Sequence, residues 1–111
     1  MAKSRSDLLQ GTLDLLILKA LTLGPLHGWG VSKRIRQMSR DVLEVNQGSL
    51  YPALHRLEDR GMITSAWKTS DEGRRAKFYR LTKKGQNQFA DEKERWKLFS
   101  TAVHNTLRAT S

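Results

Sequence analysis

The sequence predicts a mostly α-helical chain with one small β-hairpin and a long helix at its C-terminal end. Three observations indicate this class. Apolar residues recur at helical spacing in four stretches, two short alternating runs flank an arginine-rich turn, and the last helical pattern continues almost to residue 111. A helical pair followed at once by such a hairpin is the order of a winged helix-turn-helix.

The first helix is expected over residues 8–23, where Gly24-Pro25 ends it. Its interior Gly11 is a weak point that leaves the true start open. The apolar residues that recur at helical spacing are Leu9, Leu13, Leu16, Ile17, Ala20 and Leu21.

A second helix is predicted after the His27-Gly28 turn, because Val31, Ile35 and Met38 lie at i, i+4 and i+7. Residues 42–45 then form a short extended connector. The other faces of this helix carry the basic residues Lys33, Arg34, Arg36 and Arg40.

The third helix buries one leucine face and exposes a polar one. Leu50, Leu54 and Leu57 line the side that anchors to a core. The far side and its flanks carry Gly48, Ser49, Tyr51, Pro52, His55, Arg56 and Asp59. A helix with small, hydroxyl and basic groups outward can enter a DNA major groove. Its N-terminal cap is either Asn46 or Ser49, and with Asn46 Pro52 falls in the second turn.

Residues 62–68 and 76–82 alternate well enough for two strands, joined by a turn over residues 69–75. This hairpin is the expected wing. Its tip ends in Arg74 and Arg75, followed by Lys77, and such cations can touch phosphates or enter a minor groove. The alternative is a solvated turn that binds nothing, since the tip also contains two acids.

A long amphipathic helix is expected after the wing, with an apolar stripe formed by Phe89, Trp96, Phe99, Val103 and Leu107. The stripe needs a partner, and a second copy of the chain is the economical one. Folding back on the first helix is the alternative. We therefore expect a winged-helix domain over residues 1–85 and a dimerisation helix over residues 86–111.

Charge and composition favour a polyanionic partner. The net charge is +9 and the pI is about 10.4, and residues 61–85 alone carry seven Lys/Arg against two acids. A generally solvated basic surface is the alternative. The chain has no cysteine, its longest apolar stretch contains Lys19, and it shows no secretory signal, so we expect a cytoplasmic location with no membrane segment.

Enzymatic activity is not expected. His27, His55 and His104 have no ligand-like spacing, and the sequence contains no phosphate-binding glycine loop or nucleophile motif. No cofactor or metal is therefore predicted.

Four motifs in order resemble the PadR-like transcriptional regulators. They are His27-Gly28-Trp29-Gly30, the run from Gly48 to Glu58, Gly61-Met62-Ile63, and the run from Arg75 to Thr82 with Gly85. The resemblance covers about residues 8–85 and is to the short subgroup with one helix after the wing. Trp29 stands where the family more often has Tyr. The resemblance implies a dimeric repressor that binds an inverted repeat in double-stranded DNA and is often released by a small molecule.

The resemblance also assigns DNA contacts to the second helix, the third helix and the wing. Gln47 is suited to an adenine edge, Arg56 to guanine or phosphate, and Ser49 and the Tyr51 hydroxyl to phosphate or base. Tyr51 can instead pack under the wing, and His55 can be a solvated surface residue. The full set is Ser32, Lys33, Gln47, Ser49, Tyr51, Pro52, His55, Arg56, Arg74, Arg75 and Lys77.

In the short subgroup the paired last helices can frame a cavity for flat aromatic compounds, and Trp96 lies where such stacking occurs. The alternative is that Trp96 and Phe99 only pack the dimer. An architectural DNA binder without sequence preference, or a winged helix that binds proteins, is the rival function.

Overall fold

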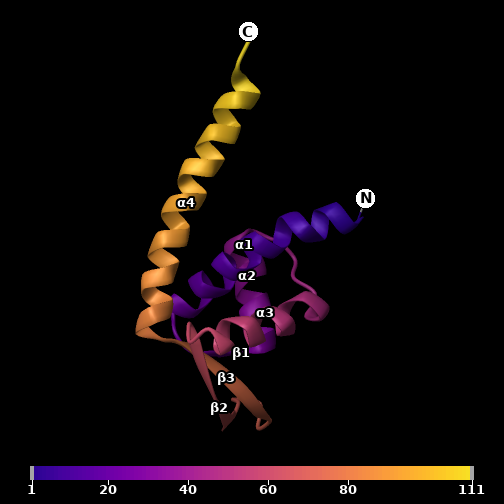
Figure 1. Cartoon of the computed structure of the whole chain (residues 1–111). Coiled ribbons are helices and arrows are strands. Elements are labelled where there is room, and N and C mark those ends of the chain that lie inside the picture. Colours follow the sequence, from indigo (N-terminus) through magenta and orange to yellow (C-terminus); the bar gives the residue numbers. More distant parts are fainter. Residues whose placement is uncertain (1, 111) are drawn as a thin grey trace.

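A computed structural model of the chain describes the backbone of residues 2–110 and the side chains of residues 11–110. Its elements in order are α1 (Ala2–Thr22), β1 (Leu26–His27), α2 (Gly28–Met38), α3 (Gln47–Asp59), β2 (Ile63–Thr69), β3 (Arg75–Leu81) and α4 (Lys83–Arg108). This order confirms the predicted winged helix-turn-helix with a long C-terminal helix. Figure 1 shows α4 rising away from the α1–α3 body, with the wing formed by β2 and β3 at the opposite end.

The core lies where α1, α2 and α3 meet under the small sheet. Its fully buried large side chains are Ile17, Leu18, Val31, Ile35, Leu50, Leu54 and Ile63. The predicted leucine face of α3 is confirmed, since Leu50, Leu54 and Leu57 are all buried. Met38 was expected on the apolar face of α2, but it is the last residue of that helix and is 39% exposed.

The first helix is longer than predicted. It begins at Ala2 rather than near residue 8, and it ends at Thr22 before Gly24 turns the chain with a φ of +128°. Gly11 lies within it, and a Cβ there would meet no atom within 4 Å. The interior glycine therefore does not set the start of the helix. Leu9, one of the apolar residues used to predict this helix, lies outside the described side chains.

The sheet has a strand that the sequence did not predict. β1 pairs antiparallel with β3 through Leu26–Tyr79 and His27–Phe78, so the strand order is β1-β3-β2. Two residues are too few to show an alternating pattern, which explains the omission. The predicted hairpin is present, with each strand shifted by one residue from its expected bounds.

The junctions around the wing are built by backbone hydrogen bonds. Gly61, at a φ of +76°, ends α3, and the N–H of Met62 donates to the Leu57 carbonyl at 2.9 Å, as in a Schellman cap. Thr82 caps α4 by accepting from the Gly85 N–H at 3.0 Å. Gly85 is buried, and a Cβ on it would lie 2.0 Å from the Met62 carbonyl oxygen. The first turn of α4 is thus packed directly on the junction between α3 and β2.

Candidate nucleic-acid interface

The exposed face of α3 begins at an asparagine cap. The side-chain oxygen of Asn46 accepts from the Ser49 N–H at 2.9 Å, which decides between the two caps that the sequence allowed. Pro52 therefore lies inside the helix. Because proline has no N–H, it cannot pair with the Gly48 carbonyl, and both residues are exposed, so water can reach that oxygen.

Four of the predicted contact residues share the solvent side of α3. They are Gln47, Ser49, Pro52 and His55, all exposed. His55 is engaged only at the surface, where its Nε2 lies 3.5 Å from an Asp59 carboxylate oxygen. The face is therefore polar, free of bulky aliphatic side chains and rigidly held by the buried leucines behind it. Such a face matches the surface that a major groove accepts.

Tyr51 lies at the edge of this face and also takes part in packing. It is 42% exposed, yet a Cβ built on Gly28 would lie 2.6 Å from its hydroxyl oxygen. The ring therefore lies against the backbone at the start of α2, and only glycine at residue 28 leaves room for it. Tyr51 helps to set how α2 and α3 cross.

Arg56 lies elsewhere than the sequence suggested. Its Nη2 is 3.0 Å from Asp14 Oδ1 on α1, and the two side chains are only 31% and 25% exposed. In this structure the guanidinium is paired with α1, and a contact with guanine would require it to leave Asp14. The reason is tertiary: Asp14 is 42 residues away in the sequence, and it draws Arg56 to the inner flank of α3.

The wing presents its two arginines to solvent. Ser70 is buried and shapes the turn, since its Oγ accepts from the Arg74 N–H at 3.2 Å. Gly73 adopts a φ of +80°, which favours glycine. Arg74 and Arg75 are exposed on either side of the start of β3. The turn is therefore well defined while its cations remain accessible.

Lys77 ties the wing to α3. Its Nζ lies 3.7 Å from one carboxylate oxygen of Glu58, and the Ser65 hydroxyl donates to the other at 2.5 Å. Lys77 is still 40% exposed, so it both positions the wing and adds positive charge beside α3.

The two predicted residues of α2 lie beside the entrance to α3. Ser32 is half-buried and its hydroxyl donates to the Trp29 carbonyl at 3.3 Å, whereas Lys33 is exposed. Both line a surface hollow of about 280 Å³ with Arg36, Glu44 and Val45. Most of the predicted contact residues therefore lie on three surfaces: α2 around Ser32 and Lys33, the exposed face of α3, and the wing.

One exposed aromatic residue of the wing was missed by sequence reasoning. Trp67, on β2, is 59% exposed and lies directly across from Lys77 in the strand register. The Arg75 guanidinium carbon is 5.6 Å from its ring centroid. In an alternating strand a tryptophan is usually interpreted as a core residue. Only its position among cationic residues could have indicated that it is exposed and available for binding.

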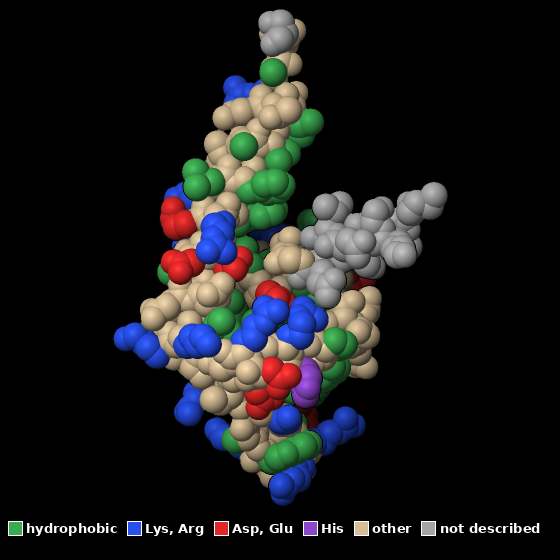
Figure 2. Space-filling view, in the orientation of Figure 1, with side chains coloured by type: hydrophobic (Ala, Val, Ile, Leu, Met, Phe, Trp, Pro, Cys, Tyr) green, Lys and Arg blue, Asp and Glu red, His purple; other side chains and the backbone are tan. Residues whose placement is uncertain are grey.

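The apolar stripe of α4 divides into two parts. Phe89 is partly buried against the core of its own chain, as the fold-back alternative expected. Trp96, Phe99, Val103 and Leu107 are all exposed. Figure 2 shows hydrophobic side chains along the projecting part of α4. The fold-back alternative accounts for Phe89 but leaves the four others uncovered within the described chain.

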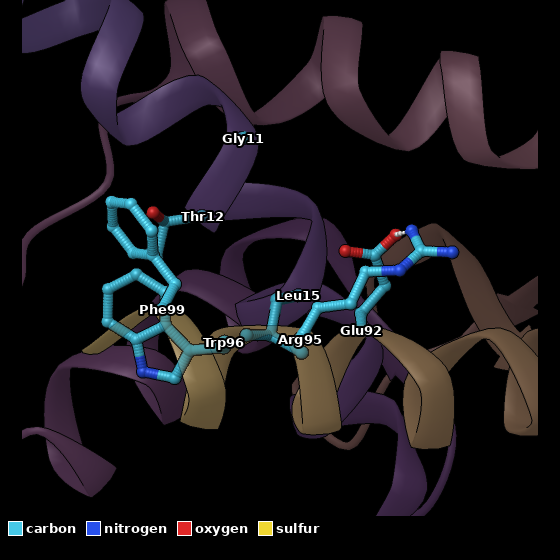
Figure 3. A pocket seen from close by; sticks show the side chains of 7 residues that line it. All are labelled: Gly11, Thr12, Leu15, Glu92, Arg95, Trp96 and Phe99. Carbon is cyan, nitrogen blue, oxygen red and sulfur yellow. Dashed lines mark ion pairs between the residues drawn. The ribbon is translucent and has the colours of Figure 1, made fainter. Parts of the chain in front are cut away.

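A hollow of about 250 Å³ lies between α1 and α4 (Figure 3). The rings of Trp96 and Phe99, with centroids 5.9 Å apart, lie at one end of it. Glu92 and Arg95 lie at the other end and form an ion pair at 3.6 Å. The hollow is open to solvent on one side and is lined by Gly11, Thr12, Leu15, Glu92, Arg95, Trp96 and Phe99.

Burial raises the pKa of Asp14 above its ordinary value of 3.8, although Arg56 attracts its charge. The folded chain therefore holds this proton more tightly than the unfolded chain does. Asp14 thus contributes extra stability below pH 3.8, and that contribution is lost as the pH rises through the raised pKa.

We expect the free energy of unfolding of the native chain to fall, relative to that of Asp14→Asn, as the pH rises from about 3.5 to 7. Urea unfolding of both chains across this range measures the difference and cancels the other carboxyl groups. An increase in the native chain's relative stability would mean that the Arg56 attraction outweighs burial.

Comparison with known proteins shows which family has this sequence and fold. The model of the PadR-like family of transcriptional regulators matches residues 17–91. A PadR-like transcriptional regulator from Bacillus cereus is 30% identical, with a TM-score of 0.79, over 94% of this chain and 99% of that one. A transcriptional regulator from Clostridium thermocellum is 29% identical, with a TM-score of 0.80, over 89% and 96%. A transcriptional regulator of Mycobacterium tuberculosis is 36% identical over 58 residues, 52% of this chain and 53% of that protein.

The fold and the exposed α3–wing surface define a winged-helix protein of the DNA-binding, transcription-regulating class. The chain belongs to the PadR-like family of transcriptional regulators. Within the described residues no helix is long and apolar enough to cross a membrane. Among the same residues, no three His, Asp or Glu side chains are grouped so that they could hold a metal ion.

Proposed function

We propose that this chain is a cytoplasmic, dimeric repressor that binds an inverted-repeat operator in double-stranded DNA. The observation that carries the proposal is the exposed polar face of α3 beside an exposed basic wing, in a family of transcriptional regulators. The winged-helix domain over residues 1–85 binds DNA, and the helix over residues 86–111 supplies the dimer contact.

Each part of the surface has a distinct role in this proposal. Gln47, in the first turn of α3, pairs with an adenine edge in the major groove, and Ser49 meets a base or phosphate. Arg74, Arg75 and Lys77 bind phosphates and fix the register of the protein on the duplex. Ser32 and Lys33 contact the DNA phosphate backbone close to the start of α3.

Two features of α4 support the dimer. The helix continues well beyond its contact with the core, and four large apolar side chains on its stripe, Trp96, Phe99, Val103 and Leu107, are exposed. An exposed stripe of this size is typical of an interaction surface. A two-fold dimer would cover both stripes and present two copies of α3 to successive turns of the duplex.

The hollow between α1 and α4 supports release by a small effector. Trp96 and Phe99 offer apolar ring surface, and Glu92 and Arg95 offer polar groups at the far end. A flat aromatic compound fits this combination. Binding there would change how α4 packs on α1 and hence the spacing of the two recognition helices.

A gel-shift assay with the DNA upstream of the chain's own gene, in excess random competitor, tests the operator proposal. We expect the operator to bind roughly a thousand-fold or more tightly than random duplex. Equal affinity for both would favour an architectural DNA binder, and no affinity for either would favour a winged helix that binds proteins.

Substituting Ala at Gln47 should cost about 1 to 3 kcal/mol on the operator and much less on random duplex, because it removes a base contact but no charge. The salt dependence should stay unchanged. Tyr51→Phe keeps the ring against Gly28 and removes only the hydroxyl, so its effect on binding reports that hydroxyl's contact alone. Equal losses on both DNAs would remove Gln47 from sequence readout.

Replacing Arg74 and Arg75 with Ala should weaken binding to every duplex and flatten the slope of log affinity against log salt by about one unit per lost phosphate contact. Fluorescence anisotropy over a salt series measures this. An unchanged slope would show that the wing arginines do not contact phosphates.

A further inference from the structure

Trp67 is the largest exposed aromatic group on the wing, and the core makes no use of it. Its neighbours across the strands are fixed by the register, which pairs Trp67 with Lys77 and Ser65 with Tyr79. Because side chains two residues apart share a face, Ser65, Trp67, Arg75 and Lys77 lie on one side of the wing. Ser65 and Lys77 both contact Glu58 on α3. The indole is therefore on the α3-facing side, nearer the tip.

Positive charge lies against this ring on one side. The Arg75 guanidinium is over it, 5.6 Å from the centroid, and Lys77 is its register partner, with Nζ near Glu58. Figure 2 shows hydrophobic atoms among Lys and Arg side chains at the end of the wing. A flat apolar surface edged by cations favours a partner that alternates apolar and anionic groups at short range. The backbone of duplex DNA does so, because each deoxyribose is flanked by phosphates.

We propose that Trp67 packs its exposed ring face against a deoxyribose at the outer edge of each half-site while Arg75 binds the adjoining phosphate. This inference rests on the proposed binding of duplex DNA. Stacking on Arg75 holds the guanidinium in place before DNA arrives, so less side-chain freedom is lost on binding. The wing thereby gains an apolar contact that salt does not screen.

Affinity measured over a salt series separates the two groups. Trp67→Ala should weaken binding to operator and random duplex alike, by roughly ten-fold at every salt concentration, with the slope kept. Arg75→Ala should flatten the slope instead. Trp67→Phe should recover most of the affinity, and Thr64→Ala, at an exposed position on the other face of the wing, is the control that should leave binding unchanged.

Hydroxyl-radical footprinting on the operator tests the sugar contact directly, since the radical attacks deoxyribose. Trp67→Ala should lose protection at the outer edges of the footprint, whereas Thr64→Ala should keep it. Affinity and protection unchanged in Trp67→Ala would overturn the proposal and leave the ring to a protein partner. A native chain without a discrete footprint would contradict the operator proposal alone, because the salt series on random duplex still decides the role of Trp67.

Discussion

Removing residues 94–111 is expected to convert the chain to a monomer and to lower operator affinity by about a hundred-fold or more. The cut keeps Gly85 and Phe89, which pack on the rest of the chain. It removes the four exposed stripe residues together with most of the α4 side of the hollow against α1. A monomer binds each half-site separately and loses the high effective concentration of the second α3. Sedimentation velocity gives the assembly state, and anisotropy gives the affinity.

A matched pair of point variants in the full-length chain shows whether loss of the dimer comes from the stripe itself or from misfolding of the truncated chain. Phe99 lies on the stripe, whereas Leu98, also exposed, is turned about 100° further round the helix from Phe99 and lies opposite Trp96. Phe99→Glu should give a monomer, and Leu98→Glu should remain a dimer. A dimer that persists after both the truncation and Phe99→Glu would place the subunit contact elsewhere.

The second large effect concerns Gly85. Substituting Ala there should lower the free energy of unfolding by on the order of 3 kcal/mol or more, because the new Cβ would lie 2.0 Å from the Met62 carbonyl oxygen. Backbone has to move to relieve that contact, and the α3–wing–α4 junction moves with it. Urea unfolding followed by circular dichroism measures the loss.

Gly11→Ala is the control for this substitution. A Cβ at Gly11 would meet no atom within 4 Å, and the residue lies within α1, so alanine should stabilise the chain by about 0.5 to 1 kcal/mol. If Gly85→Ala unfolded at the same urea concentration as the native chain, the close packing of α4 on Met62 would be refuted.

The sequence predicts most of the fold because its signals are local. The leucine spacing of α3, a capping residue at Asn46 or Ser49 and the alternation of the wing strands each depend on neighbouring residues. β1 was missed because it gains its strand character only by pairing with β3, more than 50 residues later. The start of α1 was misplaced because residues 2–7 carry no apolar residues at helical spacing, so the pattern that predicted the helix begins only near residue 8.

The candidate site was predicted less completely, because exposure and pairing are tertiary properties. The exposed positions Gln47, Ser49, Arg74 and Arg75 follow from helical and hairpin geometry. Arg56 shares the outer face of α3 by angle alone, but the distant Asp14 holds it inward. Phe89 fits the α4 stripe by spacing, but in the structure its side chain packs against the core of its own chain.

The spacing between half-sites tests the central claim, that two copies of α3 read an inverted repeat together. Inserting five base pairs between the half-sites turns one of them by about half a helical turn and places it on the opposite side of the duplex. Anisotropy on the native and the lengthened operator should then show affinity falling to that of a single half-site. Equal affinity for both duplexes would contradict the claim, because it would mean that the two half-sites are not bound by one rigid dimer.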